Sequence, residues 1–242
     1  MVNILYYIYS VELVAKYKIV DTLVTLLSKP ENRRMALLTL NNLAIPLENK
    51  HICMANSALL TGLYTILKEL SPDTYLACLC LRNLACLEET SYARLLSFQL
   101  EDGQDLMALL QTLTLTFAPS LLETTNTKFL LQSVEAHALK WSAGILRQLS
   151  TNHPQAVVNK HEGTILTILK LVAHLSEHLP LHHWTPDSLG DSCLMLLVNL
   201  AQTNTTTLLK EVSAQRYLTH LIGKGGIHDT RASWIQCSLE GL

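Results

Sequence analysis

Apolar side chains recur along this chain at the i, i+3, i+4 and i+7 spacing of an amphipathic helix. The spacing is clear in "KIVDTLVTLLS" (residues 18–28) and in "GTILTILKLVAHL" (residues 163–175). Short polar stretches that contain proline, "SKPENR" (residues 28–33) and "SPDT" (residues 71–74), separate such segments and carry the signals that end one helix and begin the next. The pattern therefore predicts an all-α protein.

A second kind of helix ends in the template Leu-x-Asn/Gln-Leu-Ala/Ser. It occurs as LNNLA, LRNLA, LRQLS and LVNLA, and its polar position is occupied by Asn42, Asn83, Gln148 and Asn199. Six residues before that position the side chain is always small: Ala36, Ala77, Ser142 and Cys193. A small residue at a fixed place in a helix allows a neighbouring helix to approach closely, which predicts that these helices stack on one another.

The four copies of the template are spaced by 41, 65 and 51 residues. The first spacing matches repeats of about 40 residues, as in arrays of stacked helices. The two longer spacings predict insertions, which we place near residues 116–128 ("TFAPSLLETTNTK") and near residues 179–191 ("LPLHHWTPDSLGD"). Both stretches contain proline and polar turn residues, so we expect loops or extra helical turns there, outside the repeating stack.

This order of helices resembles the armadillo repeat, a short helix followed by two longer ones of which the last ends in Leu-x-Asn-Leu-Ala/Ser. "NRRMALLTLNNLAIPLENKHICMANSALLTGLYTILKEL" (residues 32–70) follows the pattern throughout, and residues 138–175 follow it closely. The resemblance implies a right-handed α-superhelix. It would form a single solenoid over residues 1–242, with about four full repeats and partial repeats at both ends.

In armadillo proteins the last helix of each repeat lines a concave groove, and its asparagine can bond the backbone of an extended peptide. By resemblance, we expect Asn42, Asn83, Gln148 and Asn199 to form such a ladder in a protein that binds a protein or peptide partner and is not an enzyme. Alternatively, the same amides hold neighbouring helices in register, since a polar group in a helix interior needs a bonding partner.

The chain departs from nuclear-import receptors, which carry tryptophan four residues before the asparagine. Here those places hold Leu38, Leu79, Gly144 and Met195. The possible groove edge is instead provided by two arginines directly before the polar position and by two tryptophans seven residues before it: Arg82, Arg147, Trp141 and Trp234. The tryptophans are candidate binding anchors or core residues.

Composition excludes several classes of protein. A net charge of −2 provides no basic field for nucleic acid. No apolar run reaches the length of a membrane span. Six cysteines without a CxxC pair predict free thiols in a reducing compartment, so we expect a cytoplasmic protein, or alternatively a nuclear or cytoskeleton-associated one.

Catalytic motifs are absent from the sequence, and we expect no cofactor. The densest polar cluster is "HLSEHLPLHHW" (residues 174–184), in which His174 and His178 are spaced as a helical metal-binding pair. A polar helix end explains the cluster equally well. These two histidines are therefore weak candidates for a metal site.

Both ends of the sequence carry apolar patterns of the template kind, "NILYYIYSVELV" (residues 3–14) and "ASWIQCSLEGL" (residues 232–242). Solenoids normally need polar caps at their ends. We therefore expect at least one end to be covered by neighbouring subunits or by more polypeptide, with Trp234, Leu239 and Leu242 as contact residues if it is the C-terminal end. This leaves a second functional class open, a structural subunit of a large assembly.

Overall fold

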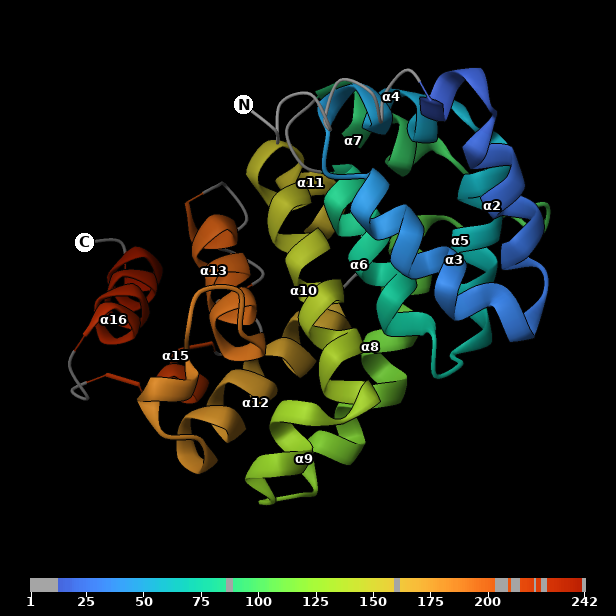
Figure 1. The fold of residues 1–242 in the computed structure, drawn as a ribbon. Helices are drawn as coiled ribbons and strands as arrows, with labels where there is room; N and C mark the ends of the chain where they lie inside the picture. Colours follow the sequence, from blue (N-terminus) through green and yellow to red (C-terminus); the bar gives the residue numbers. More distant parts are fainter. Residues whose placement is uncertain are drawn as a thin grey trace, which may run out of the picture. The chain divides into compact units, whose positions relative to one another are not determined.

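The structure, a computed structural model, describes residues 13–85, 89–158, 162–202, 209, 214–219, 221–222 and 226–240 (Figure 1). Every regular element among these residues is a helix, which confirms the predicted all-α class. The extended contact recorded in this part of the chain is one isolated bridge between Gln99 and Asp105. Within the same residues, no helix has both the length and the apolar character that crossing a membrane requires.

The chain divides into two compact units between Leu109 and Leu110, a boundary that falls inside helix α8 (Leu106–Leu122). Unit 1 contains α2 (Ile19–Leu27), α3 (Pro30–Leu43), α4 (Leu47–Ala55), α5 (Ser57–Glu69), α6 (Thr74–Ala85) and α7 (Glu89–Ser97). Here α2 packs against α3 and α5 against α6, while α2 also contacts α5 and α3 contacts α6. The short helices α4 and α7 contact each other as well. The two helices that carry the template, α3 and α6, therefore lie against each other, and so do α2 and α5, which precede them.

Local signals place the helix ends of unit 1 where the sequence predicts them. Pro30 is the first residue of α3, a position where its missing N–H costs nothing. Asn56 caps α5 by accepting a hydrogen bond from the Leu59 N–H at 3.0 Å. Leu70 ends the same helix in a left-handed conformation, with φ of 51°. The turns expected at residues 28–33 and 71–74 are thus confirmed.

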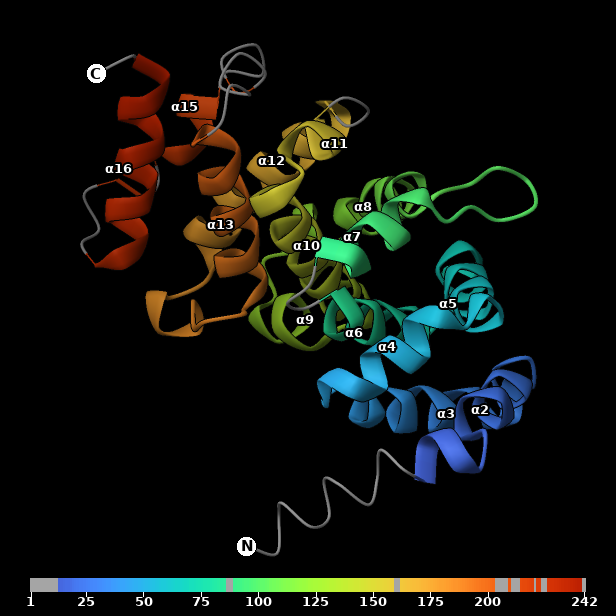
Figure 2. The same ribbon diagram turned by 90° about the horizontal axis from the view of Figure 1, so that it is seen from above.

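Unit 2 contains α9 (Thr127–Gln132), α10 (Val134–Asn152), α11 (Pro154–Val158), α12 (Glu162–His178), the 3-10 helix η1 (Leu181–His183), α13 (Leu189–Ala201), α15 (Ala214–Leu218) and α16 (Ile227–Glu240). Helix α13 contacts both α10 and α16, and α12 contacts both α13 and α15. Figures 1 and 2 show α13 between α10 and α16. Unit 2 therefore also has two rows of helices, one formed by α10, α13 and α16 and the other by α12 and α15.

We call α3, α6, α10, α13 and α16 the motif helices, because each carries the leucine template or its C-terminal counterpart. The four small residues that precede the polar position, Ala36, Ala77, Ser142 and Cys193, are all at most 1% exposed. Leucines on either side of them fill the core. The sequence therefore places its smallest side chains where the motif helices are most closely surrounded by protein.

Residues 116–128, where loops or extra helical turns are expected, are helical over most of their length. Helix α8 continues through Pro119 to Leu122, and α9 begins at Thr127. Ala118 and Leu121 are fully buried on either side of the proline, so packing outweighs its tendency to break the helix. The second expected loop, residues 179–191, contains the short helix η1 and ends where α13 begins. Whether either segment is an insertion in a single solenoid stays a prediction.

Gly190 provides a test of how closely unit 2 is packed. A Cβ atom added there would lie 2.9 Å from carbons of the Trp184 ring, which is itself 4% exposed. We expect Gly190→Ala to lower the free energy of unfolding by about 1–3 kcal/mol, as overpacked substitutions do. Gly163→Ala is the matched control, because nothing lies within 4 Å of its added Cβ. The control should be neutral or stabilise by up to about 1 kcal/mol. Urea denaturation of both variants measures the difference in unfolding free energy. Equal effects would show that the Trp184 ring moves to make room for the added methyl group.

Candidate binding surface on the motif helices

Asn83 connects two successive motif helices of unit 1. Its Nδ2 group on α6 donates a hydrogen bond of 2.6 Å to Oδ1 of Asn41 on α3. One turn earlier on the same face, Cys80 Sγ donates to the Leu37 carbonyl oxygen at 3.2 Å. The polar position of the template thus faces the preceding motif helix, where it meets a polar partner.

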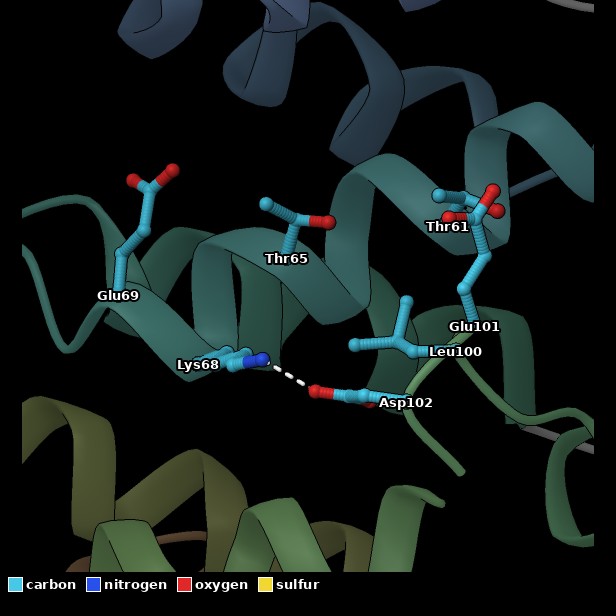
Figure 3. Close-up of a pocket in the computed structure, with 7 residues that line it drawn as sticks. All are labelled: Thr61, Thr65, Lys68, Glu69, Leu100, Glu101 and Asp102. Carbon is cyan, nitrogen blue, oxygen red and sulfur yellow. Dashed lines mark hydrogen bonds and ion pairs between the residues drawn. The ribbon is translucent and has the colours of Figure 1, made fainter. Parts of the chain in front are cut away.

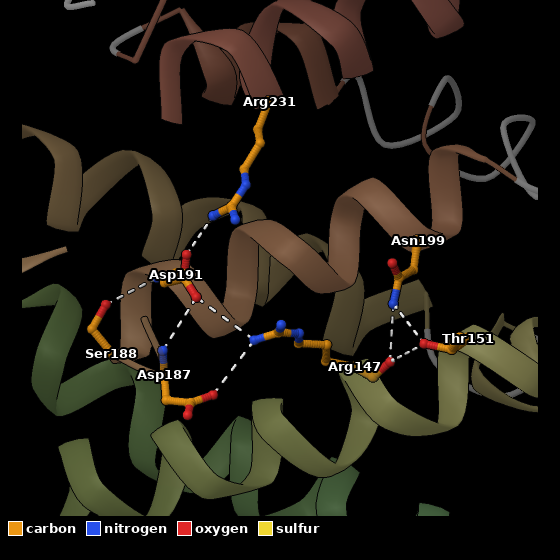
Figure 4. A network of polar contacts seen from close by, with 7 residues as sticks. All are labelled: Arg147, Thr151, Asp187, Ser188, Asp191, Asn199 and Arg231. Carbon is orange, nitrogen blue, oxygen red and sulfur yellow. Dashed lines mark hydrogen bonds and ion pairs between the residues drawn. The ribbon is translucent and has the colours of Figure 1, made fainter. Parts of the chain in front are cut away.

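Asn199 makes the corresponding connection in unit 2 (Figure 4). Its Nδ2 group on α13 lies 3.0 Å from the carbonyl oxygen of Arg147 and 3.0 Å from Oγ of Ser150, both on α10. Oγ1 of Thr151 is a third acceptor at 3.2 Å. The amide therefore binds acceptors in the last turns of α10, which is the geometry expected of a side chain that holds two helices in register.

The other two predicted ladder residues are placed differently. Asn42 is exposed on α3, one residue after the Asn41 side chain that binds Asn83. Gln148 is half-buried on α10. Asn83 and Asn199 are thus occupied between helices, and binding of a peptide by any of the four amides stays a prediction.

The predicted groove-edge residues also differ in their surroundings. Arg82 is half-buried on α6, and Arg147 on α10 forms ion pairs described below. Trp141 is half-buried, with Nζ of Lys140 4.3 Å from its ring centroid, a cation–π distance. Trp234 on α16 is 39% exposed, so it is the more accessible of the two candidate anchors.

Asp191 is a site residue that the sequence analysis missed. It lies at the start of α13, is 4% exposed, and its carboxylate forms an ion pair with Arg231 of α16 through Oδ1. Through Oδ2 it lies 3.6 Å from Nη1 of Arg147 on α10 and accepts a hydrogen bond of 3.3 Å from the Asp187 N–H. Its own N–H donates to Ser188 Oγ (Figure 4). One buried carboxylate thereby connects three motif helices.

Part of this network was detectable in the sequence. Ser188 and Asp191 form the S-x-x-D pattern that marks the start of a helix. The sequence could not show that Arg147 and Arg231 contact Asp191, because Arg147 lies 44 residues before it and Arg231 lies 40 residues after it.

The histidine cluster does not gather into a metal site in the described residues, where no group of three or more potential ligands is found. His174 Nε2 lies 2.7 Å from the carbonyl oxygen of Thr124, so it donates to that carbonyl. The rings of His174 and His178 are 4.4 Å apart, and Nε2 of His178 lies 3.8 Å from the Glu177 carboxylate. The cluster forms a polar helix end with local partners.

Comparison with protein-family models finds none that matches this chain, and comparison with curated proteins finds none that is similar to it.

Unit 1 exposes several apolar side chains on the motif helix α3. Met35 is 69% exposed, Leu38 is 38% exposed and Ile45, two residues after the helix ends at Leu43, is 66% exposed. Met35, Leu38 and the exposed Asn42 follow the spacing of one face of α3, and Ile45 lies in the turn that follows. We call these four residues the α3 surface. Such an apolar patch with a central amide is typical of a surface that contacts another protein.

A hollow with a volume of about 600 Å³ lies beside α5 in unit 1 (Figure 3). The lining carries one cation, Lys68, and three carboxylates, those of Glu69, Glu101 and Asp102. Lys68 forms an ion pair with Asp102, and this bond holds the pKa of Asp102 below its ordinary value. Glu69 accepts a hydrogen bond of 2.5 Å from Arg33. Carboxylates therefore outnumber cations in the lining, so the hollow does not favour an anionic ligand.

The buried thiols do not add chemistry to either unit. Cys53, Cys78, Cys80 and Cys193 are buried, which fits the expectation of free cysteines that pack as small apolar groups. Burial raises the pKa of Cys53 to about 11 and that of Cys193 to about 12. These thiols therefore stay protonated at neutral pH and are not nucleophiles.

Removing the Asn199 amide tests its role between helices. We expect Asn199→Ala to lower the free energy of unfolding by about 1–2 kcal/mol, because it leaves acceptors on α10 without their donor. Asn42→Ala carries the same gain in helix propensity at an exposed position and should change stability by less than about 0.5 kcal/mol. Chemical denaturation compares the two. If both variants were equally stable, the amides would not be structural.

Neutralising Asp191 tests the charged network. We expect Asp191→Asn to destabilise the protein by about 2 kcal/mol, because it leaves two partly buried arginines without their shared carboxylate. Asp187→Asn is the control: that side chain is 49% exposed, and its loss should cost less than about 1 kcal/mol. Arg231→Met should cost less in the Asp191→Asn background than in the wild type, as coupled residues do. Additive losses in a double-mutant cycle would contradict the network.

Proposed function

We propose that this protein is a non-enzymatic, cytoplasmic scaffold of the armadillo type that binds another protein through its motif helices. The observation that supports the proposal most strongly is the recurrence of like-on-like helix contacts. In unit 1 α3 packs on α6 beside α2 on α5, and in unit 2 α10, α13 and α16 pack in succession beside α12 and α15. Repeated helices of this kind present long surfaces to partners.

The α3 surface is the part of the motif helices best suited to a partner. Its apolar side chains would lose water on binding, which contributes roughly 25 cal/mol for each Å² of apolar surface covered. Arg34 lies beside it with a side chain that is 60% exposed, and Nη2 of Arg34 donates a hydrogen bond of 3.0 Å to the Tyr75 hydroxyl. This bond orients the guanidinium at the edge of the patch. The partner we expect is a protein segment with apolar anchors and a polar rim.

Affinity purification with matched variants tests the proposal. The double variant Met35→Glu, Leu38→Glu places charges on the α3 surface, where the exposed side chains leave the core untouched. We expect proteins that co-purify with the wild type to be lost with this variant, since burying two unpaired carboxylates opposes binding. Leu115→Glu is the control, an equally apolar and 44% exposed position on α8.

Circular dichroism should show the same helical content for all three proteins. The proposal fails for this surface if the recovered proteins are the same with the double variant as with the wild type. Parallel losses with the Leu115→Glu control would instead indicate a general effect of added charge.

A second candidate function, a structural subunit of a larger assembly, is favoured by helix α16. Its residues Ile227 and Trp234 are 60% and 39% exposed and lie two turns apart on one face. Leu239, also expected to contact a neighbour, is already buried by this chain, and Leu242 lies outside the described residues. A purified chain that self-associates, and becomes monomeric on Trp234→Glu, would favour this function over the adaptor.

A further inference from the structure

A small hollow lies in unit 2 where α9, the first half of α10 and the segment around η1 meet. Its volume is about 240 Å³. Pockets for drug-sized ligands typically measure about 300–1,000 Å³, so this hollow suits a smaller group. It is lined by Leu130, Leu131, Ala136, His137, Lys140, His182, His183, Thr185, Ser188 and Leu189.

The lining is rich in nitrogen bases and holds no carboxylate in this described part of the chain. Lys140 provides a permanent positive charge, and its ammonium is positioned by the Trp141 ring at 4.3 Å. His137 lies one helical turn away on α10. His182 and His183 approach from η1, with ring centroids 4.1 Å apart. Three histidines and one lysine thus line one small hollow from two elements.

Charged residues of the surrounding elements lie outside the lining. They are Lys128 on α9, Glu135 on α10, and Asp187 and Asp191 at the start of α13. Both aspartates lie 3.6 Å from Arg147, and Asp191 also binds Arg231. The carboxylates of Asp187 and Asp191 are therefore paired with arginines, and the lining of the hollow itself contains only basic ionisable groups.

The environment of His137 shows what this hollow lacks. Burial lowers the pKa of His137, and the positive charge of Lys140 lowers it further. A neutral imidazole is therefore favoured when the space holds no anion. A negative charge placed there would favour the protonated form instead, because opposite charges stabilise each other at short range.

We propose that this hollow binds a small oxyanion of the phosphate type, with Lys140 as the fixed cation and His137, His182 and His183 as N–H donors. The size of the hollow, its basic lining and its neutralised surroundings point to the same ligand class. This site is separate from the partner surface proposed above and does not depend on it. An anion in the hollow favours the protonated form of His137, so affinity increases as the pH falls through the range in which that imidazole takes up its proton.

Sulfate is the sharpest probe, because its charge does not change over that range, whereas phosphate itself titrates. Isothermal titration calorimetry with sulfate at about pH 6 and about pH 8 should show binding several-fold tighter at the lower pH. Lys140→Met keeps the aliphatic stem against Trp141 but removes the charge, and we expect it to weaken binding at least about tenfold. Lys170→Met is the matched control, an exposed lysine on α12 outside the lining.

The histidines have their own readout. His137→Gln should reduce the pH dependence of sulfate binding more than Lys170→Met does, and histidine ring signals in NMR should shift on titration in the wild type. Comparing phenyl phosphate with inorganic phosphate then separates the two sources of the anion: tighter binding of the ester indicates a phosphorylated partner, and equal binding indicates a free oxyanion.

Three results would overturn the site. The first is no sulfate binding at millimolar concentration. The second is an affinity that does not change with pH. The third is an equal loss with Lys140→Met and Lys170→Met, which would show that net charge alone attracts the anion. Thermal unfolding of each variant, monitored by circular dichroism, ensures that a loss of binding is not a loss of fold.

Discussion

Each unit depends on the contact between one motif helix and the motif helix before it. In unit 1 this contact includes Asn83 on Asn41 and Cys80 on the Leu37 carbonyl, and in unit 2 it includes Asn199 on the last turns of α10. In unit 1 short turns join α2 to α3 and α5 to α6, so the second row of helices shares the spacing of the motif helices. The interhelix amide therefore fixes the register of two neighbouring helices within an otherwise apolar interface.

The fixed amide also explains how a polar residue is retained in an otherwise apolar helix. A half-buried amide without a bonding partner destabilises the fold, whereas one that reaches acceptors on the next helix contributes both energy and direction. Arg147 on α10 contacts α13 in two ways. Its carbonyl oxygen accepts a hydrogen bond from Asn199, and its guanidinium lies beside the Asp191 carboxylate. Since these α13 residues are eight positions, or about 12 Å, apart along the helix axis, α10 fixes α13 at two separate points.

Charge in unit 2 is divided between two neighbouring places with different roles. The aspartates at the start of α13 are enclosed by Arg147 and Arg231, and this network ties α10, α13 and α16 together. The lysine and histidines line a small hollow whose lining contains no carboxylate. The first arrangement serves the stacking of helices, and the second is suited to an external anion. The α3 surface of unit 1, in contrast, is mainly apolar.

The sequence by itself determined the helical class, the turns near Pro30 and Pro72, and the positions of the template on α3, α6, α10 and α13, because these follow from periodicity and local backbone preference. It also identified the small residues that the fold buries completely. The tertiary structure alone decided that α8 continues through Pro119, that Asp191 meets Arg231, and that His137 and Lys140 share a hollow with His182 and His183. These features depend on packing between segments about 40 residues apart, and such contacts leave no periodic trace in the chain.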